Sequence, residues 1–507
     1  MIFTSCIPAL DMLIVPLDPL SKPVGPIVVN DRFLGVPYCR ESLQQVGLSL
    51  LHGSLLYPLR TPSLRRWRNP LSFVFTIERA DKDTPKTLSL PSHYTNQKLF
   101  QMPVKFAIIK ERKDPPDRRV VFSPQKCQDV IKAFPEALFL VEQSDIRIFP
   151  DIAYTNAGCT VTDDVAEADV LLGVKEVPVE ALLPKKKYFF FSHTIKKQPY
   201  NRKLLLAILD KKIELYDHET IVKENGARLI GFGRYAGLVG AYNGFRALGI
   251  RDGLFKLPIV EHLADLDAVK HELDQITLPK NLRIILSGNG KVTHGAKEIL
   301  DHLKIKEVTD AAYLSESFAE PVYCLIDVTE YNKRMDGLPV VKHVFYQDPS
   351  GHVSDFMRYA KVSDFFIAGH FYGNGAPYLF TREDAKHPDF NINLVADISC
   401  DVDGPVASTL RASTIADPFY GYDAATEREV PFGTPNSIGV MAVDNLPCEL
   451  PKDASDGFGA MFLENVIPAF FNGDADGILD RARMTTHQGT LTERFSYLQD
   501  YVDGTEA

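Results

Sequence analysis

The sequence predicts an α/β protein with two domains, each built on a parallel sheet, and a cleft between them. Apolar runs with the length and composition of buried strands recur from residue 104 onward. Most gaps between these runs fit a helix with turns, the connection that parallel neighbouring strands need. Ionisable residues follow several runs directly, and open parallel sheets bind ligands beyond the carboxyl ends of their strands. The pattern therefore indicates an enzyme.

Bulk composition narrows the function classes. The chain has 507 residues, enough for two or three domains. Its net charge of -10, without a dense basic region, argues against nucleic-acid binding. No apolar run reaches the roughly 18 residues that a membrane-spanning helix needs. The seven cysteines form no C-x-x-C pair, so no metal site or disulfide framework is indicated and a reducing cytoplasm is expected. The sequence does not predict an oligomeric state.

Residues 1–101 differ from the rest of the chain. Their apolar residues show no steady period and prolines recur among them, whereas a clean strand pattern begins at residue 104. One hypothesis is that Met102 is the natural start and that residues 1–101 are a misassigned extension. The alternative is that residues 1–101 form a poorly ordered additional segment.

The first domain is predicted over residues 102–235, as a substrate-binding and catalytic domain. Four apolar runs in it end in ionisable clusters, and its last strand is expected over residues 227–232. The four runs are residues 106–110, 170–174, 188–191 and 212–216.

Two bases are expected at the carboxyl rim of this first sheet. Lys175 and His193 follow strands that should be neighbours. An imidazole titrates near pH 6.5, so a histidine can accept and donate protons at neutral pH. Lysine needs burial or a nearby cation to lower its pKa before it can act as a base.

Four further charged residues are candidates for the same rim. Glu176 and Glu219 can adjust the pKa of the bases or bind a substrate ammonium group, and Lys113 and Arg119 can bind carboxylates, Arg119 in bidentate fashion. Each alone is more often an ordinary surface charge. Their convergence on one rim favours a site.

The second domain is predicted over residues 236–445, and residues 446–507 are expected to pack back on the first domain. Small residues at 237, 240, 241 and 244 predict a joining helix that packs closely against another backbone. The long, loop-rich segment between residues 329 and 393 is of a kind that is often functional. Strands are expected at residues 282–286, 322–328, 364–368, 394–398 and 437–443.

A glycine loop follows the first of these strands. Residues 287–296 lie between the strand at 282–286 and a helix expected over 296–303. This order is typical of a Rossmann-like dinucleotide-binding domain, in which Gly288 permits the tight turn and Gly290 lets a pyrophosphate approach the helix N-terminus. The spacing G-x-G-x-x-x-x-G departs from the usual G-x-G-x-x-G, and a plain strand-to-helix turn is the alternative.

An acidic residue about 20 positions further on should bind the ribose hydroxyls. Asp310 stands where such a residue is expected. An acid there favours NAD over NADP, because it repels a 2′-phosphate, although NADP stays possible.

Several segments together resemble the saccharopine dehydrogenase family, within the alanine dehydrogenase and transhydrogenase fold of two Rossmann-like domains. Alanine dehydrogenases carry Met-Pro-Gly-Ala-Val-Pro where residues 445–451 of this chain read Asn-Leu-Pro-Cys-Glu-Leu-Pro, so saccharopine chemistry is preferred. The segments that carry the resemblance are residues 173–175, 190–196, 231–237, 397–401, 444–447 and 450–451.

The resemblance implies interconversion of saccharopine with L-lysine and 2-oxoglutarate, with NAD or NADP. By carry-over, Lys175 takes the amine proton and His193 activates water for imine hydrolysis. Lys113 and Arg119 hold substrate carboxylates, and Glu176 and Glu219 tune the bases. Lys113 is one residue further from Arg119 than in the fungal pattern, which leaves its role open. The cofactor-binding residues implied are Gly288, Gly290, Gly295, Asp310 and Asp397.

Two other readings stay open at the level of sequence. One is an amino-acid dehydrogenase of the alanine dehydrogenase type. The other is a non-catalytic NAD(H)-binding sensor. In all three cases the expected partners are small molecules, without nucleic acid or membrane.

Overall fold

The structure is a computed structural model that describes residues 27–30, 49–51, 54–57, 102–113, 115–373 and 375–505. The chain divides into two compact units, Met1–Phe100 and Gln101–Ala507. In the first unit three short strands form an antiparallel sheet in the order β1-β3-β2. These are β1 (Ile27–Asn30), β2 (Ser49–Leu51) and β3 (Ser54–Tyr57). Most of residues 1–101 lie outside the described ranges, so both hypotheses about them stay predictions.

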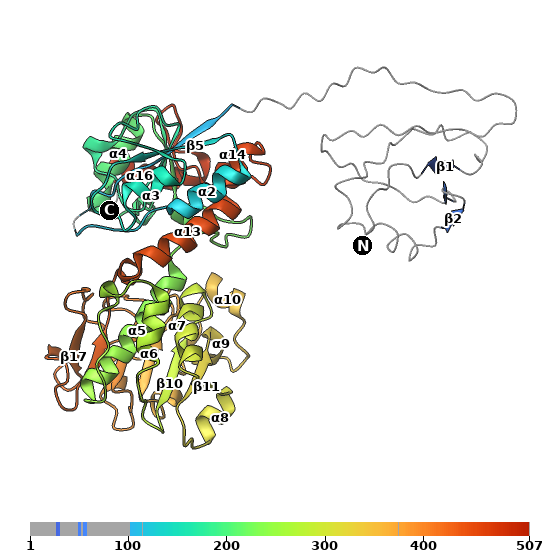
Figure 1. The fold of residues 1–507 in the computed structure, drawn as a ribbon. Coiled ribbons are helices and arrows are strands. Elements are labelled where there is room, and N and C mark those ends of the chain that lie inside the picture. The colour runs from blue at the N-terminus through green and yellow to red at the C-terminus, as the bar shows by residue number, and fades with distance from the viewer. Residues whose placement is uncertain are drawn as a thin grey trace, which may run out of the picture. The chain divides into compact units, whose positions relative to one another are not determined.

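The second unit begins with a six-stranded sheet in the order β6-β5-β4-β7-β8-β9, in which every neighbouring pair is parallel. Figure 1 shows β5 of this sheet among helices. All three residues of β7 are buried, as expected for a strand covered on both faces. The strands are β4 (Val104–Ile108), β5 (Ala137–Glu142), β6 (Thr160–Thr162), β7 (Val170–Leu172), β8 (Lys187–Phe190) and β9 (Glu214–Asp217).

Helices from both ends of the unit cover this sheet. The Ser123 hydroxyl caps α2 by accepting from the Lys126 backbone N–H, and Pro124 occupies the first turn. The backbone N–H of Val120 donates to Ser455 Oγ at 3.0 Å, so the C-terminal segment packs back on the first sheet as predicted. The helices are α2 (Pro124–Ala133), α3 (Asp151–Asn156), α4 (Arg202–Asp210), α13 (Pro451–Asn465), α14 (Ile467–Phe471), α15 (Ile478–Ala482) and α16 (Gln499–Asp503).

The prediction of a strand over residues 227–232 is wrong. That segment is a loop with one isolated bridge, between Val222 and Arg228. The outer edge of β9 is covered by the C-terminal segment instead, because the Met484 N–H donates to the Leu215 carbonyl and the Leu215 N–H donates to Thr485 Oγ1. Four residues of this loop line a pocket instead: Arg228, Ile230, Gly231 and Phe232.

The second sheet has eight strands in the order β11-β12-β10-β15-β16-β19-β17-β18. The five predicted strands are present and parallel, whereas β17 and β18 add an antiparallel edge that the sequence analysis did not predict. The strands are β10 (Arg283–Ser287), β11 (Lys306–Glu307), β12 (Val322–Ile326), β15 (Phe365–Ala368), β16 (Leu394–Asp397), β17 (Phe419–Asp423), β18 (Arg428–Val430) and β19 (Ile438–Met441).

Helix α5 (Gly233–Arg251) leads from the first sheet to the second and is buried along most of its length. A Cβ on Gly237 would lie 1.9 Å from the carbonyl oxygen of Val292 in α7, so the predicted close packing of this helix is confirmed. The other helices are α6 (Leu266–Leu273), α7 (Lys291–His302), α8 (Asp310–Ser315), α9 (Val328–Tyr331), α10 (Lys342–Gln347), α11 (Met357–Ala360) and α12 (Arg382–Ala385).

The long segment after α9 carries a small antiparallel sheet of β13 (Asn332–Arg334) and β14 (His352–Ser354). The architecture is thus α/β with two parallel sheets, as predicted. The domain boundaries after residues 101, 235 and 445 stay predictions.

Candidate functional site

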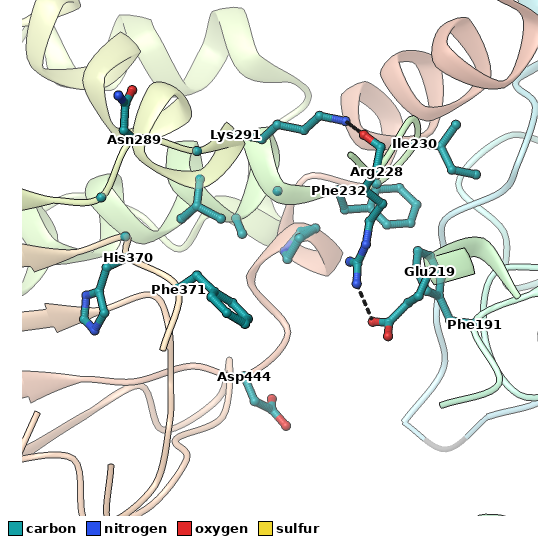
Figure 2. Close-up of a pocket in the computed structure, with 18 of the residues that line it drawn as sticks. Phe191, Glu219, Arg228, Ile230, Phe232, Asn289, Lys291, His370, Phe371 and Asp444 are labelled. Atoms are coloured by element: carbon teal, nitrogen blue, oxygen red, sulfur yellow. Dashed lines mark hydrogen bonds and ion pairs between the residues drawn. The ribbon is translucent and has the colours of Figure 1, made fainter. Parts of the chain in front are cut away.

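A pocket of about 550 Å³ receives residues from the ends of both sheets (Figure 2). Lys175 and His193 line it from the first sheet, and Gly288 and Gly290 line it from the second. The two predicted bases and the glycine loop therefore meet in one cavity.

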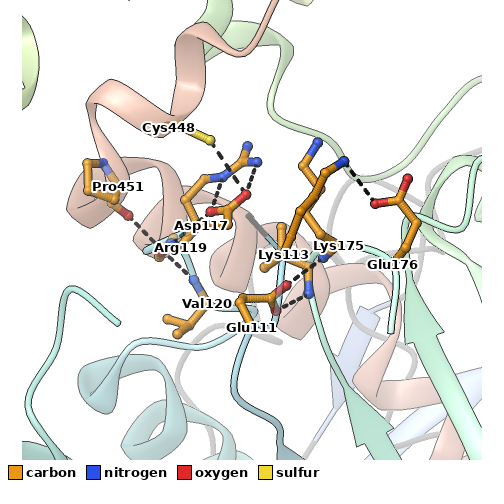
Figure 3. Close-up of polar contacts among 11 residues, drawn as sticks. Glu111, Lys113, Asp117, Arg119, Val120, Lys175, Glu176, Cys448 and Pro451 are labelled. Atoms are coloured by element: carbon orange, nitrogen blue, oxygen red, sulfur yellow. Dashed lines mark hydrogen bonds and ion pairs between the residues drawn. The ribbon is translucent and has the colours of Figure 1, made fainter. Parts of the chain in front are cut away.

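Lys175 follows β7, and its backbone is held in place by a buried carboxylate. The two oxygens of Glu111 accept from the backbone N–H groups of Val174 and Lys175, at 2.7 and 2.9 Å (Figure 3). Burial raises the pKa of Glu111 to about 7. Glu111 was not among the site residues predicted from the sequence, although its place just after the neighbouring strand β4 was a signal for it.

Burial and two nearby cations act on the Lys175 amine. Burial is the largest cause that lowers its pKa, and the positive charges of Arg119 and Lys113 lower it further. These are the conditions under which a lysine can act as a base near neutral pH.

His193 is joined to Glu176. Its Nδ1 lies 2.6 Å from Glu176 Oε1, and Lys113 Nζ lies 3.2 Å from the other oxygen, Oε2. Burial alone would raise the pKa of Glu176, but the hydrogen bond with His193 and the charges of His193 and Lys113 lower it to about 2. Glu176 is therefore ionised at neutral pH and orients the imidazole. Lys113 and Glu176 do not line the pocket themselves.

Arg119 lines the pocket but is engaged by its neighbour Asp117. Its Nε and Nη2 donate to the two carboxylate oxygens at 3.0 and 2.6 Å, and its guanidinium lies over the Phe232 ring. The bidentate face is thus occupied, so bidentate binding of a substrate carboxylate through Nε and Nη2 is excluded in this conformation. Nη1 has no hydrogen-bond partner among the described residues. The pairing outweighs the effect of burial and lowers the pKa of Asp117 to about 2.

Glu219 also lines the pocket. Its backbone N–H donates to Asp217 Oδ1 at 2.7 Å, which sets the turn after β9. Its carboxylate pairs with Arg228 at 3.5 Å, and Lys291 donates to the Arg228 carbonyl (Figure 2).

The glycine loop is shorter than predicted, because α7 begins at Lys291 and not at residue 296. Gly288 has φ +99°, and a Cβ there would lie 2.8 Å from both Gly369 O and His370 Cα. A Cβ on Gly290 would meet nothing within 4 Å, so open space lies beside the N-terminus of a twelve-residue helix. A strand, a tight glycine turn and a free helix N-terminus together fit a pyrophosphate.

Gly295 does not line the pocket. It lies inside α7, where a Cβ would come 2.0 Å from the Arg234 carbonyl oxygen of α5. Its role in the structure is close helix packing, which corrects the expectation that it contacts the dinucleotide.

Asp310 does not line the pocket either. It begins α8, contacts the Tyr359 hydroxyl and lies 3.6 Å from Arg358. The expectation failed because β11 is an outer strand of two residues, and β12 lies between it and β10.

The acid at the end of the strand next to β10 is Asp327, which lines the pocket. The Gly288 N–H donates to the carbonyl of Ile326, which directly precedes Asp327, at 2.8 Å. The signal that was missed is an acid directly after the full-length buried strand 322–326.

Asp397 is fully buried and does not line the pocket. It accepts hydrogen bonds from Ser399 Oγ at 2.5 Å and from Thr409 Oγ1 at 2.6 Å. Burial raises its pKa, although these hydrogen bonds oppose the rise. Its contacts order the loop after β16, and its expected place beside the ribose stays a prediction.

No helix in the described ranges is long and apolar enough to cross a membrane. No group of three or more His, Cys, Asp or Glu side chains in them is placed to hold a metal ion.

Comparison with known proteins gives consistent relatives. The family model of the alanine dehydrogenase/PNT N-terminal domain matches residues 107–239. Alpha-aminoadipic semialdehyde synthase of Rattus norvegicus is 29% identical over 79% of this chain and 48% of its own length. Saccharopine dehydrogenase [NAD(+), L-lysine-forming] of Yarrowia lipolytica is 25% identical over 72% of this chain and 92% of its own length.

The chain thus spans about half the length of the semialdehyde synthases it matches. Among solved structures, an L-alanine dehydrogenase superposes with a TM-score of 0.54 at 17% identity, covering 79% of this chain and 99% of that one. The resemblance predicted from the sequence is therefore confirmed: this chain is similar in sequence to alpha-aminoadipic semialdehyde synthases and saccharopine dehydrogenases, and it shares the fold of an L-alanine dehydrogenase.

Proposed function

We propose that this chain is an NAD(P)-dependent oxidoreductase that interconverts saccharopine with L-lysine and 2-oxoglutarate. The observation that carries the proposal is the single pocket in which Lys175 and His193 face the same space as the glycine loop. The relationship to saccharopine dehydrogenases supports the choice of substrate.

The residues present fit a dinucleotide. Gly288 and Gly290 leave room beside the N-terminus of α7, whose N–H groups suit a pyrophosphate. When bound, the nicotinamide ring exchanges hydride with the substrate carbon that carries the secondary amine. Gly295, Asp310 and Asp397 are not needed for this fit.

Lys175 serves as the base for the substrate amine. A protonated amine cannot lose hydride easily, because a doubly cationic carbon–nitrogen unit would result, so the nitrogen must first be neutral. Burial, Arg119 and Lys113 lower the pKa of Lys175 and so favour the neutral amine that accepts this proton.

His193 serves the second half of the reaction, the hydrolysis of the imine. Glu176 holds its Nδ1 and leaves Nε2 to take a proton from the attacking water. Glu219 supplies negative charge for the lysine ammonium group. The positive charges of Arg119 and Lys113 attract the substrate carboxylates.

The test is a spectrophotometric panel with NADH and NADPH. Lysine plus 2-oxoglutarate should oxidise the reduced cofactor, and Lys175→Met and His193→Gln should each lower kcat about 10²-fold or more, the usual contribution of a positioned acid or base. Lys203→Met, an exposed lysine on α4, is the matched control and should keep wild-type turnover. Wild-type rates in both site variants, or turnover of pyruvate with ammonia but not of lysine with 2-oxoglutarate, would overturn the proposal.

We also propose that the chain works in a reducing compartment, as expected for the cytoplasm. The five cysteines in the described ranges are free thiols: Cys127, Cys159, Cys324, Cys400 and Cys448. Small molecules are the proposed partners.

A further inference from the structure

We propose that Asp327 and Lys342 together read the 2′ position of the cofactor's adenosine ribose, and that Lys342 is the residue that admits a 2′-phosphate. The inference rests on the proposed function only in placing a dinucleotide in this pocket. It predicts that the chain binds both NADH and NADPH and assigns each preference to a different side chain.

The strand order brings this pair to the ribose position. β12 pairs with β10 along five residues, with Ile326 opposite Ser287, and the Gly288 N–H donates to the Ile326 carbonyl. Asp327 therefore lies one residue beyond the contact with the tight glycine turn. In dinucleotide-binding sheets, an acid at the end of the strand beside the glycine loop is within reach of the ribose hydroxyls.

The Asp327 carboxylate is held in a defined orientation. Its Oδ1 accepts from the Val328 N–H at 2.8 Å and caps α9, while its own N–H donates to Glu330 Oε2 at 2.8 Å. Only 14% of the Asp327 side chain is exposed. Its other oxygen, Oδ2, contacts the ammonium group of Lys342.

Lys342 is the more exposed member of the pair. It begins α10 in the segment between β12 and β15, lines the same pocket, and has a side chain that is 44% exposed. The hydrogen bond to Asp327 raises its pKa, so it is cationic at neutral pH. A lysine ammonium on a flexible stem can leave a carboxylate carrying one charge for a phosphate carrying nearly two.

The two side chains favour different groups at the 2′ position. A ribose 2′-hydroxyl can donate to Asp327 Oδ2, whereas a 2′-phosphate is repelled by that carboxylate and attracted by Lys342. An aspartate alone would exclude NADP. With Lys342 beside it, the charge of the Asp327 carboxylate is balanced, so the pair discriminates weakly between the two cofactors.

The test is calorimetric titration of the full chain with NADH and with NADPH, without amino-acid substrate. Lys342→Met should weaken NADPH binding about tenfold or more, the size of one charge-assisted hydrogen bond, and should leave NADH binding nearly unchanged. Asp327→Asn keeps a side chain that can cap α9 and should raise the preference for NADPH over NADH about tenfold.

The matched control is Lys333→Met, on β13 of the same segment. This lysine pairs with Asp355 at 3.2 Å and does not line the pocket, so its loss should leave both affinities unchanged. Equal weakening of both cofactors by Lys342→Met, or an unchanged preference in both pocket variants, would overturn the inference.

Failure of the proposed function gives a different result. If wild-type protein binds neither dinucleotide, both proposals are wrong. If the expected preferences appear but lysine and 2-oxoglutarate do not react, only the proposed reaction is wrong.

Discussion

The surroundings of Lys175 are formed by residues that lie far from it in the sequence. Glu111 at the end of β4 holds its backbone, and Arg119 and Lys113 lower the pKa of its amine. A lysine at a strand end is ordinary. The carboxylate under its backbone and the two cations near its side chain distinguish this one, because they fix the position of its backbone and lower the pKa of its amine.

The Glu111 contact can be tested by Glu111→Gln. The glutamine amide would place an N–H group against one of two backbone N–H donors, so a buried donor loses its partner. We expect the free energy of unfolding to fall by about 1–3 kcal/mol, measured by urea denaturation. Glu180→Gln, at an exposed glutamate, is the control, and equal midpoints for the two variants would contradict the assignment.

At the scale of elements, the contact between α5 and α7 supports the site. Gly237 on α5 and Gly295 on α7 each face the backbone of the other helix. The N-terminus of α7 carries the glycine loop, and the N-terminus of α5 contributes Gly233 and Ala236 to the pocket. The helix contact therefore holds the glycine turn close to the end of the first sheet.

Gly237→Ala should disrupt this contact. The new methyl group would lie 1.9 Å from Val292 O and 2.7 Å from Ala296 N, and backbone atoms cannot rotate away as side chains can. We expect a loss of about 3 kcal/mol or more in unfolding free energy, measured by denaturant titration. Gly290→Ala, which meets no atom within 4 Å, should keep the wild-type midpoint; a similar loss in both variants would show that the helix contact is not the cause.

At the scale of the whole second unit, the chain crosses between the sheets along α5 and returns through residues 446–505. The return begins at η8 (Leu446–Glu449), where Asn243 of α5 donates to Glu449 Oε1 at 2.8 Å. Burial raises the pKa of Glu449 to about 7. A buried acid that joins the outward and returning segments makes stability depend on pH.

The sign of this dependence follows from the two pKa values. The folded state keeps the Glu449 proton up to about pH 7, whereas an unfolded glutamate loses it near pH 4.5, so the contribution is present at low pH and is lost as pH rises through 7. Glu449→Gln cannot titrate, and its stability relative to wild type should rise by up to about 3 kcal/mol between pH 5 and pH 7.5.

Urea denaturation at several pH values between 5 and 7.5 measures the difference. Glu464→Gln, at an exposed glutamate on α13, should run parallel to wild type across this range. A constant gap between Glu449→Gln and wild type would show that Glu449 is already ionised in the folded protein at pH 5.

The fold class, most of the strands and the positions of Lys175 and His193 could be predicted from the sequence alone. Buried parallel strands such as β7 and β8 are continuous apolar runs, so their ends can be recognised locally, and Lys175 and His193 stand at those ends. Gly288 and Gly290 could be predicted for the same reason, because a tight turn between a strand and a helix is a local feature.

Which residues lie beside Lys175, His193 and the glycine loop depends on the tertiary structure. Asp327, and not Asp310, lies beside the glycine loop because strand order in a sheet is not sequence order. Arg119 is occupied by Asp117, and Gly295 packs against α5. Glu111 and Lys342 reach their partners across 63 and 15 residues of chain. Such contacts depend on how distant elements pack, and no local pattern of residues encodes that packing.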